Sequence, residues 1–195
     1  TIISPGFLTA RNILNVIQQN VSVIIAGCAI TLLMVAGYFD LSIGSIMALA
    51  GTMSAVFVSS FQLPLVLSIF LSVFLGGVIG LLNGFLVILM NVPSIIATLG
   101  TMYAVSGVAW VITGGNSIHL GLGRDFTLLG RGFIGPVPVS IFVTVLIFLL
   151  FYFLQHKTLL GKYSYAIGGN RRTALLSGIN VSVVSILLYV IVGIL

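Results

Sequence analysis

Ionisable side chains that could do chemistry are scarce in this sequence of 195 residues. Asp40 and Asp125 are the only acids, and His119 and His156 are the only histidines. Neither a pair of catalytic carboxylates nor a His-Glu-x-x-His zinc site can be assembled from this set. We therefore predict no catalytic residue, no metal site and no cofactor, and we interpret both histidines as solvated residues of polar loops.

Asp40 is the most informative of these residues, because it is the only charged residue between positions 12 and 123. An acid at membrane depth is costly unless it faces water, a partner or a cavity. In Asp40-Leu41-Ser42-Ile43 the carboxylate could also cap a helix by accepting its first free amides. The two interpretations are compatible, and we predict that Asp40 caps a helix that begins inside the membrane and lines a polar route.

Two segments open small-residue helices after a break: DLSIGSIMALAG at 40–51 and PSIIATLGTMYAVSG at 93–107. Interrupted apolar segments of this kind are the best sequence indication of a transport route. The alternative for each hydroxyl is a bond to a carbonyl of its own helix. The residues expected along the route are Asp40, Ser42, Ser45, Pro93, Ser94, Thr98 and Thr101.

The composition indicates the environment that must position these residues. Hydrophobic residues make up 59% of the chain and charged residues only 5%, which excludes an ordinary soluble enzyme or nucleic-acid binder. The formal charge of +5 comes from seven cations and is better interpreted as topology information than as a nucleic-acid footprint. We predict an all-α, multi-pass transmembrane bundle with interrupted helices, embedded in a lipid bilayer as one domain over 1–195.

The apolar runs and their breaks predict the elements of this bundle. An interfacial amphipathic helix is expected over 9–19, with Thr9 as its N-cap. Further breaks fall at Pro64, at Pro93 and in the Gly- and Pro-rich connection 114–138, which could dip back toward the membrane. The expected spans are 21–36, 41–60, 65–90, 94–113, 139–154 and one starting near 179.

The basic residues predict the orientation. Segment 155–177 holds Lys157, Lys162, Arg171 and Arg172 without an acid, whereas 114–138 nets one positive charge. The first segment should therefore be cytoplasmic and the second external, as should the N-terminal amphipathic segment. A re-entrant half-helix within 21–61 is the alternative that would upset this assignment.

Small residues recur at helical spacing and predict close helix packing. The third span carries Gly76, Gly80 and Gly84, with Asn83 as the nearby polar side chain. We interpret its glycine face as structural and not as substrate-binding. Similar stripes occur in the second and fourth spans, at Gly44, Ala48, Thr52 and Ala55 and at Gly100, Ala104 and Gly107.

Three ordered motifs carry a family resemblance: VAGYFDLSIGSIMALAG (35–51), NVPSIIATLGTMYAVSGVAWVITGG (91–115) and GKYSYAIGGNRRTALLSGINVSVVSILLY (161–189). Together they resemble the permease subunit of bacterial ABC importers for simple sugars, a type II importer fold whose members include ribose, xylose, arabinose, galactose and autoinducer-2 systems. Two positions depart from the family pattern. Tyr38 and Phe39 stand where a glycine and an aliphatic residue are usual, and Arg171 and Arg172 stand where an acidic residue is usual.

The resemblance implies a permease of the bacterial inner membrane, with no enzymatic activity of its own, that helps to translocate a simple sugar. It implies three partners: a second permease copy, a cytoplasmic ABC ATPase and a periplasmic sugar-binding protein. It also implies that 155–178 is a cytoplasmic coupling loop, with 168–179 a short helix on the ATPase. The residues assigned to this contact are Gly168, Gly169, Asn170, Arg171, Arg172, Ala174, Ser177 and Gly178.

Two other classes compete with this interpretation. An ion-coupled secondary transporter would need intramembrane acids or bases, and Asp40 is the only candidate. A membrane-embedded enzyme would need a nucleophile, a base or a metal set, which the chain lacks. Family members run on for several more helices, so we expect a fragment that is incomplete at both ends.

Overall fold

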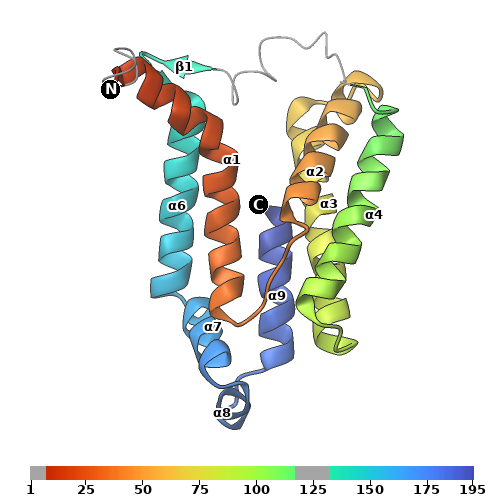
Figure 1. The fold of residues 1–195 in the computed structure, drawn as a ribbon, viewed down its shortest axis with the longest axis vertical. Coiled ribbons are helices and arrows are strands. Elements are labelled where there is room, and N and C mark those ends of the chain that lie inside the picture. Colours follow the sequence, from red (N-terminus) through yellow and green to blue (C-terminus); the bar gives the residue numbers. More distant parts are fainter. Residues whose placement is uncertain (1–7, 117–131) are drawn as a thin grey trace.

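The computed structural model describes residues 8–116 and 132–195. Within these ranges the chain is helical apart from short connections and one small hairpin, β1 (Phe133–Ile134) paired antiparallel with β2 (Val137–Pro138). The hairpin and the N-terminus lie at one end of the molecule, and the short helix α8 (Arg171–Leu176) lies at the other. We call these the hairpin end and the α8 end (Figure 1).

Helix α1 (Ala10–Val35) is one continuous helix of 26 residues, and Thr9 caps it by accepting the amide of Asn12. The predicted separation into an interfacial helix and a first span is therefore wrong. The physical reason is local, because no glycine or proline occurs between Ala10 and Ala26 to interrupt the helix. The predicted N-cap at Thr9 is confirmed.

The crossing that follows is interrupted, as predicted. After α1 the chain runs extended over 36–42, climbs from the α8 end to mid-height, and only then forms α2 (Ile43–Ser59), which continues to the hairpin end (Figure 1). Gly37 allows the initial turn, because its φ of 84° lies in the left-handed region that glycine adopts without strain. The region 21–61 thus runs to the α8 end and back to the hairpin end. The predicted alternation of membrane sides stays a prediction.

The next two helices form a hairpin of their own. Helix α3 (Leu65–Gly84) starts after Pro64 and continues through a π-helical turn, η1 (Phe85–Leu89). Helix α4 (Ser94–Thr113) starts after Pro93. In both connections a residue with positive φ lies two positions before the proline, namely Gln62 and Asn91. The predicted breaks at these prolines are confirmed.

The last part of the chain returns along α1. Helix α6 (Val139–Lys157) packs beside α1, and α7 (Leu159–Gly169) and α8 turn beneath it at the α8 end (Figure 1). Helix α9 (Val181–Ile194) then rises between α1 and α3. Segment 155–177, predicted as a loop with one short helix, therefore consists mostly of helices. His156, predicted to lie in a loop, lies in the last turn of α6, and His119 lies outside the described residues.

Four of these helices are long and apolar enough to cross a membrane: Asn12–Val35, Leu65–Leu89, Ser94–Thr113 and Val139–Lys157. Helices α2 and α9 are apolar but shorter. The buried apolar core is concentrated toward the α8 end, where Leu32 and Leu33 of α1 meet Leu188 and Tyr189 of α9. Most other side chains of the spans stay exposed, which suits helices that face lipid.

Candidate functional site

The interrupted crossing places a buried carboxyl group between three helices. Asp40 lies in the extended segment just before α2, and none of its surface is exposed. Its Oδ1 accepts the backbone amide of Ser42 at 2.7 Å and the Ser42 hydroxyl at 2.6 Å. Burying an ionisable group is tolerated only when such partners replace water. Asp40 thus organises the residues from which α2 starts.

Asn83 of α3 completes this arrangement. Its side-chain amide donates to Asp40 Oδ2 at 3.2 Å and to Ser42 Oγ at 2.8 Å, and Asn83 is itself fully buried. Across from it, Thr98 of α4 accepts the backbone amide of Leu41 at 3.2 Å. We call Asp40, Ser42, Asn83 and Thr98 the Asp40 cluster. It fixes the extended segment to α3 on one side and to α4 on the other.

The importance of Asn83 was missed by the sequence analysis, which noted it only as a polar neighbour of the glycine face. One signal could have found it. Asn83 is the only amide or charged side chain in the apolar run from 65 to 90, and such a group inside a membrane helix needs a partner. Its Oδ1 is buried without a hydrogen-bond partner among the described residues. The Asp40 cluster therefore contains one hydrogen-bond acceptor, Asn83 Oδ1, that is free to accept a further donor.

The capping role predicted for Asp40 is fulfilled only in part. The residue at the N-cap position of α2 is Ser42, whose side chain makes no capping bond to the helix. Asp40 bonds the amide of Ser42, one residue before the first helical residue, Ile43. Its carboxylate therefore orients the entry into the helix instead of satisfying the amides of the first turn.

Two tyrosines attach the same extended segment to α9. Tyr189 donates its hydroxyl to the carbonyl oxygen of Phe39 at 3.2 Å, and Ser185 donates to the hydroxyl of Tyr38 at 3.3 Å. The rings of Tyr38 and Tyr189 are tilted, with centroids 6.0 Å apart. The aromatic residue at position 38, unusual for the resembled family, therefore has a packing partner in this chain.

The structure brings some of the predicted route residues together and leaves others apart. Asp40, Ser42 and Thr98 belong to the Asp40 cluster, and Ser45 adjoins it by donating to the carbonyl of Ser42. Thr98 and Thr101 donate to carbonyls four residues earlier in α4, which is the alternative expected for membrane hydroxyls. Pro93 and Ser94 begin α4 at the α8 end, where Pro93 is exposed and Ser94 half-buried.

At the α8 end the predicted coupling residues have distinct structural settings. Gly168 lies against the last turn of α1, where a Cβ atom would collide with the carbonyl of Val35. Asn170 caps α8 by accepting the amides of Arg172 and Thr173, each at 3.0 Å. Ala174 is buried, whereas Arg171 and Arg172 are exposed. The turn after α8 contains Ser177 and Gly178. The φ of Gly178 is 81°, in the left-handed region that glycine adopts without strain.

The predicted glycine contact of α3 is confirmed. A Cβ atom on Gly76 or Gly80 would collide with the carbonyl of Gly193 or Tyr189 in α9, respectively, and one on Gly84 would lie 3.1 Å from the Cα of Ile186. Close packing is wrong for the α4 stripe within the described residues, and the α2 stripe is packed only in part, because Ala55 is buried whereas Gly44 is exposed. Gly44 of α2 and Gly100 and Gly107 of α4 have no neighbour within 4 Å of such an atom.

Several apolar crossings, one of them broken at mid-height around a buried polar cluster, define a multi-pass membrane protein of the transport class. The comparison with protein families identifies the kind of transport protein. Residues 12–195 match the model described as "Branched-chain amino acid transport system / permease component". The chain belongs to this family of ABC transporter permeases, which confirms the prediction of a permease that is not an enzyme.

The curated relatives that the chain matches include permeases named for ribose and for arabinose. The chain is 38% identical over its whole length to the ribose import permease protein RbsC of Bacillus subtilis, of which it covers 61%. It is 34% identical over 99% of its length to RbsC of Escherichia coli K12, again covering 61%. The L-arabinose ABC transporter permease protein AraH of Azospirillum brasilense is 35% identical over 97% of the chain, which covers 55% of AraH. No solved structure matches.

The chain thus spans about three fifths of the length of the two RbsC relatives. It is a multi-pass membrane protein homologous to permeases of the bacterial cell membrane. The resemblance on which the sequence analysis relied is confirmed by these matches.

Proposed function

We propose that this chain is part of the membrane-spanning subunit of an ABC importer that translocates a simple sugar across the bacterial inner membrane. The observation that carries the proposal is the similarity over essentially the whole chain to permeases whose names specify ribose or arabinose. The interrupted crossing supports it, because a break at mid-height provides polar backbone and side-chain groups where a substrate must cross.

The proposed route passes the start of α2 and the first turns of α4. Asp40, Ser42, Ser45, Pro93, Ser94, Thr98 and Thr101 are its proposed residues. In the conformation described, Asp40, Ser42 and Thr98 are fully buried, so the Asp40 cluster supports the wall of the route instead of offering free groups to a sugar. Movement of α2 relative to α3 and α4 would expose these groups, and the hydrogen bonds from Asn83 resist that movement.

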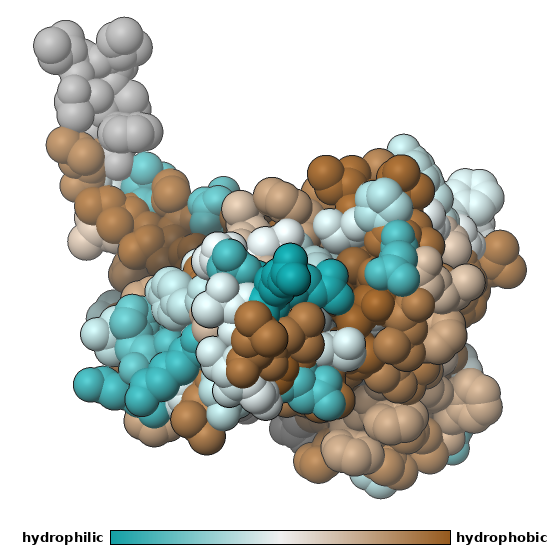
Figure 2. Space-filling model, turned by 90° about the horizontal axis from the view of Figure 1, so that it is seen from below, coloured by the Kyte–Doolittle hydropathy of each residue, from teal (hydrophilic) through white to brown (hydrophobic). Residues whose placement is uncertain are grey.

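The proposed contact with a cytoplasmic ABC ATPase is the α8 end, the coupling segment 155–178. Leu176 is 83% exposed and Leu175 is 55% exposed, beside the exposed cations Arg171 and Arg172. Figure 2, which looks onto this end, shows apolar side chains next to strongly polar ones on the projecting surface. Exposed leucines at the membrane surface are typical of a site covered by a protein partner. The basic residues of segment 155–178 support the assignment of this end to the cytoplasmic side.

Reconstitution of the full-length permease tests the proposal. Proteoliposomes would contain the permease with its ATPase and would receive the sugar-binding protein, with labelled ribose, arabinose and galactose as substrates. We expect uptake of at least one sugar only with ATP and an active ATPase. Uptake driven by an ion gradient without the ATPase would instead identify a secondary transporter, and uptake of a branched-chain amino acid alone would reject sugar as the substrate.

The orientation has its own test. An Arg171→Cys variant of the full-length permease, made in a background without any other cysteine, would be treated in intact cells with a membrane-impermeant maleimide. We expect no labelling until the cells are opened, because position 171 faces the cytoplasm. Ready labelling of intact cells would reverse the topology and reject the ATPase contact at this end.

A further inference from the structure

A groove of about 400 Å³ lies between α1 and α6 toward the α8 end, away from the Asp40 cluster. Tyr165 of α7 lies at its lower end, and the remaining walls come from two helices: Ile24, Gly27, Cys28 and Thr31 of α1 and Phe148, Phe151, Tyr152, Gln155 and His156 of α6. Gly27 provides part of the space, because a Cβ atom there would have no neighbour within 4 Å. None of these residues belongs to the proposed sugar route. Gln155, His156 and Tyr165 fall within the coupling segment 155–178 but are not among the residues named for the ATPase contact.

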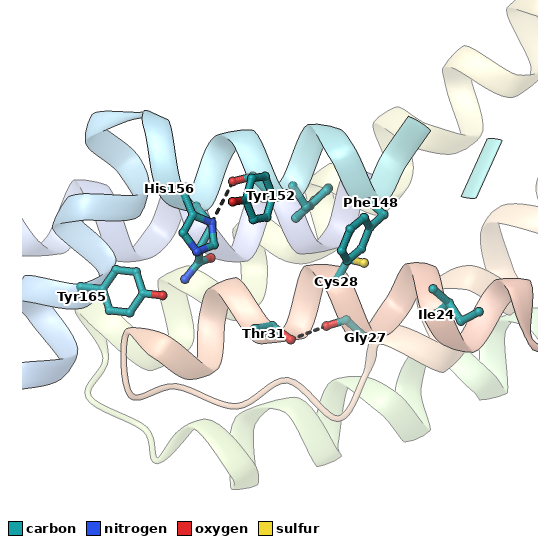
Figure 3. Close-up of a pocket in the computed structure, with 10 residues that line it drawn as sticks. Ile24, Gly27, Cys28, Thr31, Phe148, Tyr152, His156 and Tyr165 are labelled. Carbon is teal, nitrogen blue, oxygen red and sulfur yellow. Dashed lines mark hydrogen bonds between the residues drawn. The ribbon is translucent and has the colours of Figure 1, made fainter. Parts of the chain in front are cut away.

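The groove is amphipathic along its length. Ile24 and Phe148 line the part deeper in the membrane, whereas His156 and Tyr165 lie toward the α8 end (Figure 3). Gln155, which precedes His156 in α6, also lines the groove. Phe148 and His156 are eight residues apart on α6, so the groove follows about 12 Å of helix. That length fits within one leaflet, because the hydrocarbon core of a bilayer is about 30 Å thick. An occupant should therefore have an apolar tail and a polar end at the membrane surface.

Gln155 supplies an unsatisfied hydrogen-bond donor at the polar end. Its residue is only 9% exposed, and its Nε2 is buried without a hydrogen-bond partner among the described residues. Leaving a buried amide donor unpaired costs about 1–3 kcal/mol, so an acceptor from the occupant would stabilise the site. The neighbouring polar group, His156, is already engaged: its Nδ1 lies 3.0 Å from the carbonyl of Tyr152, and its ring stacks on that of Tyr152.

The charge of the α8 end specifies the occupant further. Lys157 directly follows the groove on α6, Lys162 lies on α7, and no acid occurs from 155 to 177. We propose that the groove binds an anionic phospholipid of the cytoplasmic leaflet. One acyl chain lies along Phe148 and Ile24, an ester or phosphate oxygen accepts a hydrogen bond from Gln155 Nε2, and the basic surface favours the anionic headgroup.

Cys28, the only cysteine of the sequence, lines the groove and can report its occupancy. The full-length permease would be delipidated in detergent and treated with N-ethylmaleimide, with modification of Cys28 followed by peptide mass spectrometry. We expect Cys28 to react, and added phosphatidylglycerol to slow its reaction more than phosphatidylcholine does. Equal protection by both lipids would overturn the anionic preference. A Cys28 that stays unreactive without lipid would show that the remainder of the protein or a second copy covers the groove, and would overturn the proposal.

Matched variants separate the groove from general lipid effects. Gln155→Met keeps the size of the side chain but removes the donor, and should weaken protection by phosphatidylglycerol about fivefold. Gly27→Leu fills the groove and should abolish the lipid-dependent part of the protection. The controls are Gln19→Met, on an exposed position of α1, and Gly51→Leu, on α2 where a Cβ atom also has open space. Unchanged protection in both groove variants, or equal loss in the controls, would reject the site.

Discussion

The glycines of α3 and those of α4 follow the same kind of pattern but have opposite surroundings. Gly76, Gly80 and Gly84 are pressed against the backbone of α9. On α4, Gly100 and Gly107 have open space where a side chain would project. The spacing of small residues therefore indicates that a helix can be approached closely, but it does not indicate that the approaching helix is present.

The difference has a physical origin. Helix α9 contributes its own small residue to the α3 contact, because Gly193 lies against the carbonyl of Gly76 just as Gly76 lies against Gly193. At Gly80 and Gly84 the glycine of α3 alone lets the backbone of α9 approach, next to Tyr189 and Ile186. Dispersion contacts then hold the pair in a medium that gives no hydrophobic driving force. Helix α4 instead packs on α2, and its buried residues include Ala97 and Val105, whereas its glycine stripe is exposed.

The largest effect is expected where the glycine contact is tightest. In Gly80→Leu the new side chain would collide with the carbonyl of Tyr189, and the separation of α3 from α9 should cost on the order of 3 kcal/mol. The yield of folded full-length permease, measured by size-exclusion chromatography in detergent, should fall severely. Gly100→Leu is the matched control and should leave the yield of the monomer within about twofold. A well-folded Gly80→Leu protein with altered sugar selectivity would instead make this face a binding site.

A smaller effect is expected where side chains, not backbones, join the helices. In Asp40→Leu the Ser42 amide loses its acceptor, at about 1–3 kcal/mol, whereas the Asn83 side-chain amide keeps the Ser42 hydroxyl as a second acceptor. Asp40→Asn should be tolerated better, because the new side chain keeps one oxygen for Ser42. Its amide can also pair with the unpartnered Oδ1 of Asn83 after that side chain rotates.

The two Asp40 variants are compared by thermal unfolding of the purified permease and by uptake in the reconstituted system. We expect Asp40→Asn to fold with altered transport and Asp40→Leu to lose both folding and transport. Normal uptake by both variants would show that the Asp40 cluster has no part in the route. Equal unfolding temperatures would show that its hydrogen bonds do not hold α2 in place.

The sequence predicted the elements better than their contacts. Pro64 and Pro93 located two helix starts because proline restricts the backbone locally, whatever surrounds it. The continuity of α1 was missed because polar residues such as Asn15 and Gln19 indicated an interface, although nothing in the backbone required a break there. Polarity of side chains and termination of a helix are separate properties.

The Asp40 cluster was only half predictable for a related reason. Asp40 and Ser42 are neighbours in the sequence, and their interaction could be expected from local geometry. Asn83 is 41 residues from Ser42, and its contact depends on how α3 packs against the start of α2. The same long-range packing decides which glycine stripe is buried. No local pattern contains that information.

The smallest and most discriminating effect is expected when a single methyl group is added to either of two glycines. Gly100→Ala adds a Cβ atom where nothing lies within 4 Å, so the change should be neutral or should stabilise α4 by about 0.5–1 kcal/mol through its helix propensity. Gly80→Ala places the same atom against the carbonyl of Tyr189 and should destabilise the protein, despite the same gain in propensity. Thermal unfolding of the two purified variants would therefore shift in opposite directions. A downward shift for Gly100→Ala would show that the stripe on α4 also has a close neighbour in the full-length permease, and would remove the contrast between the two helices.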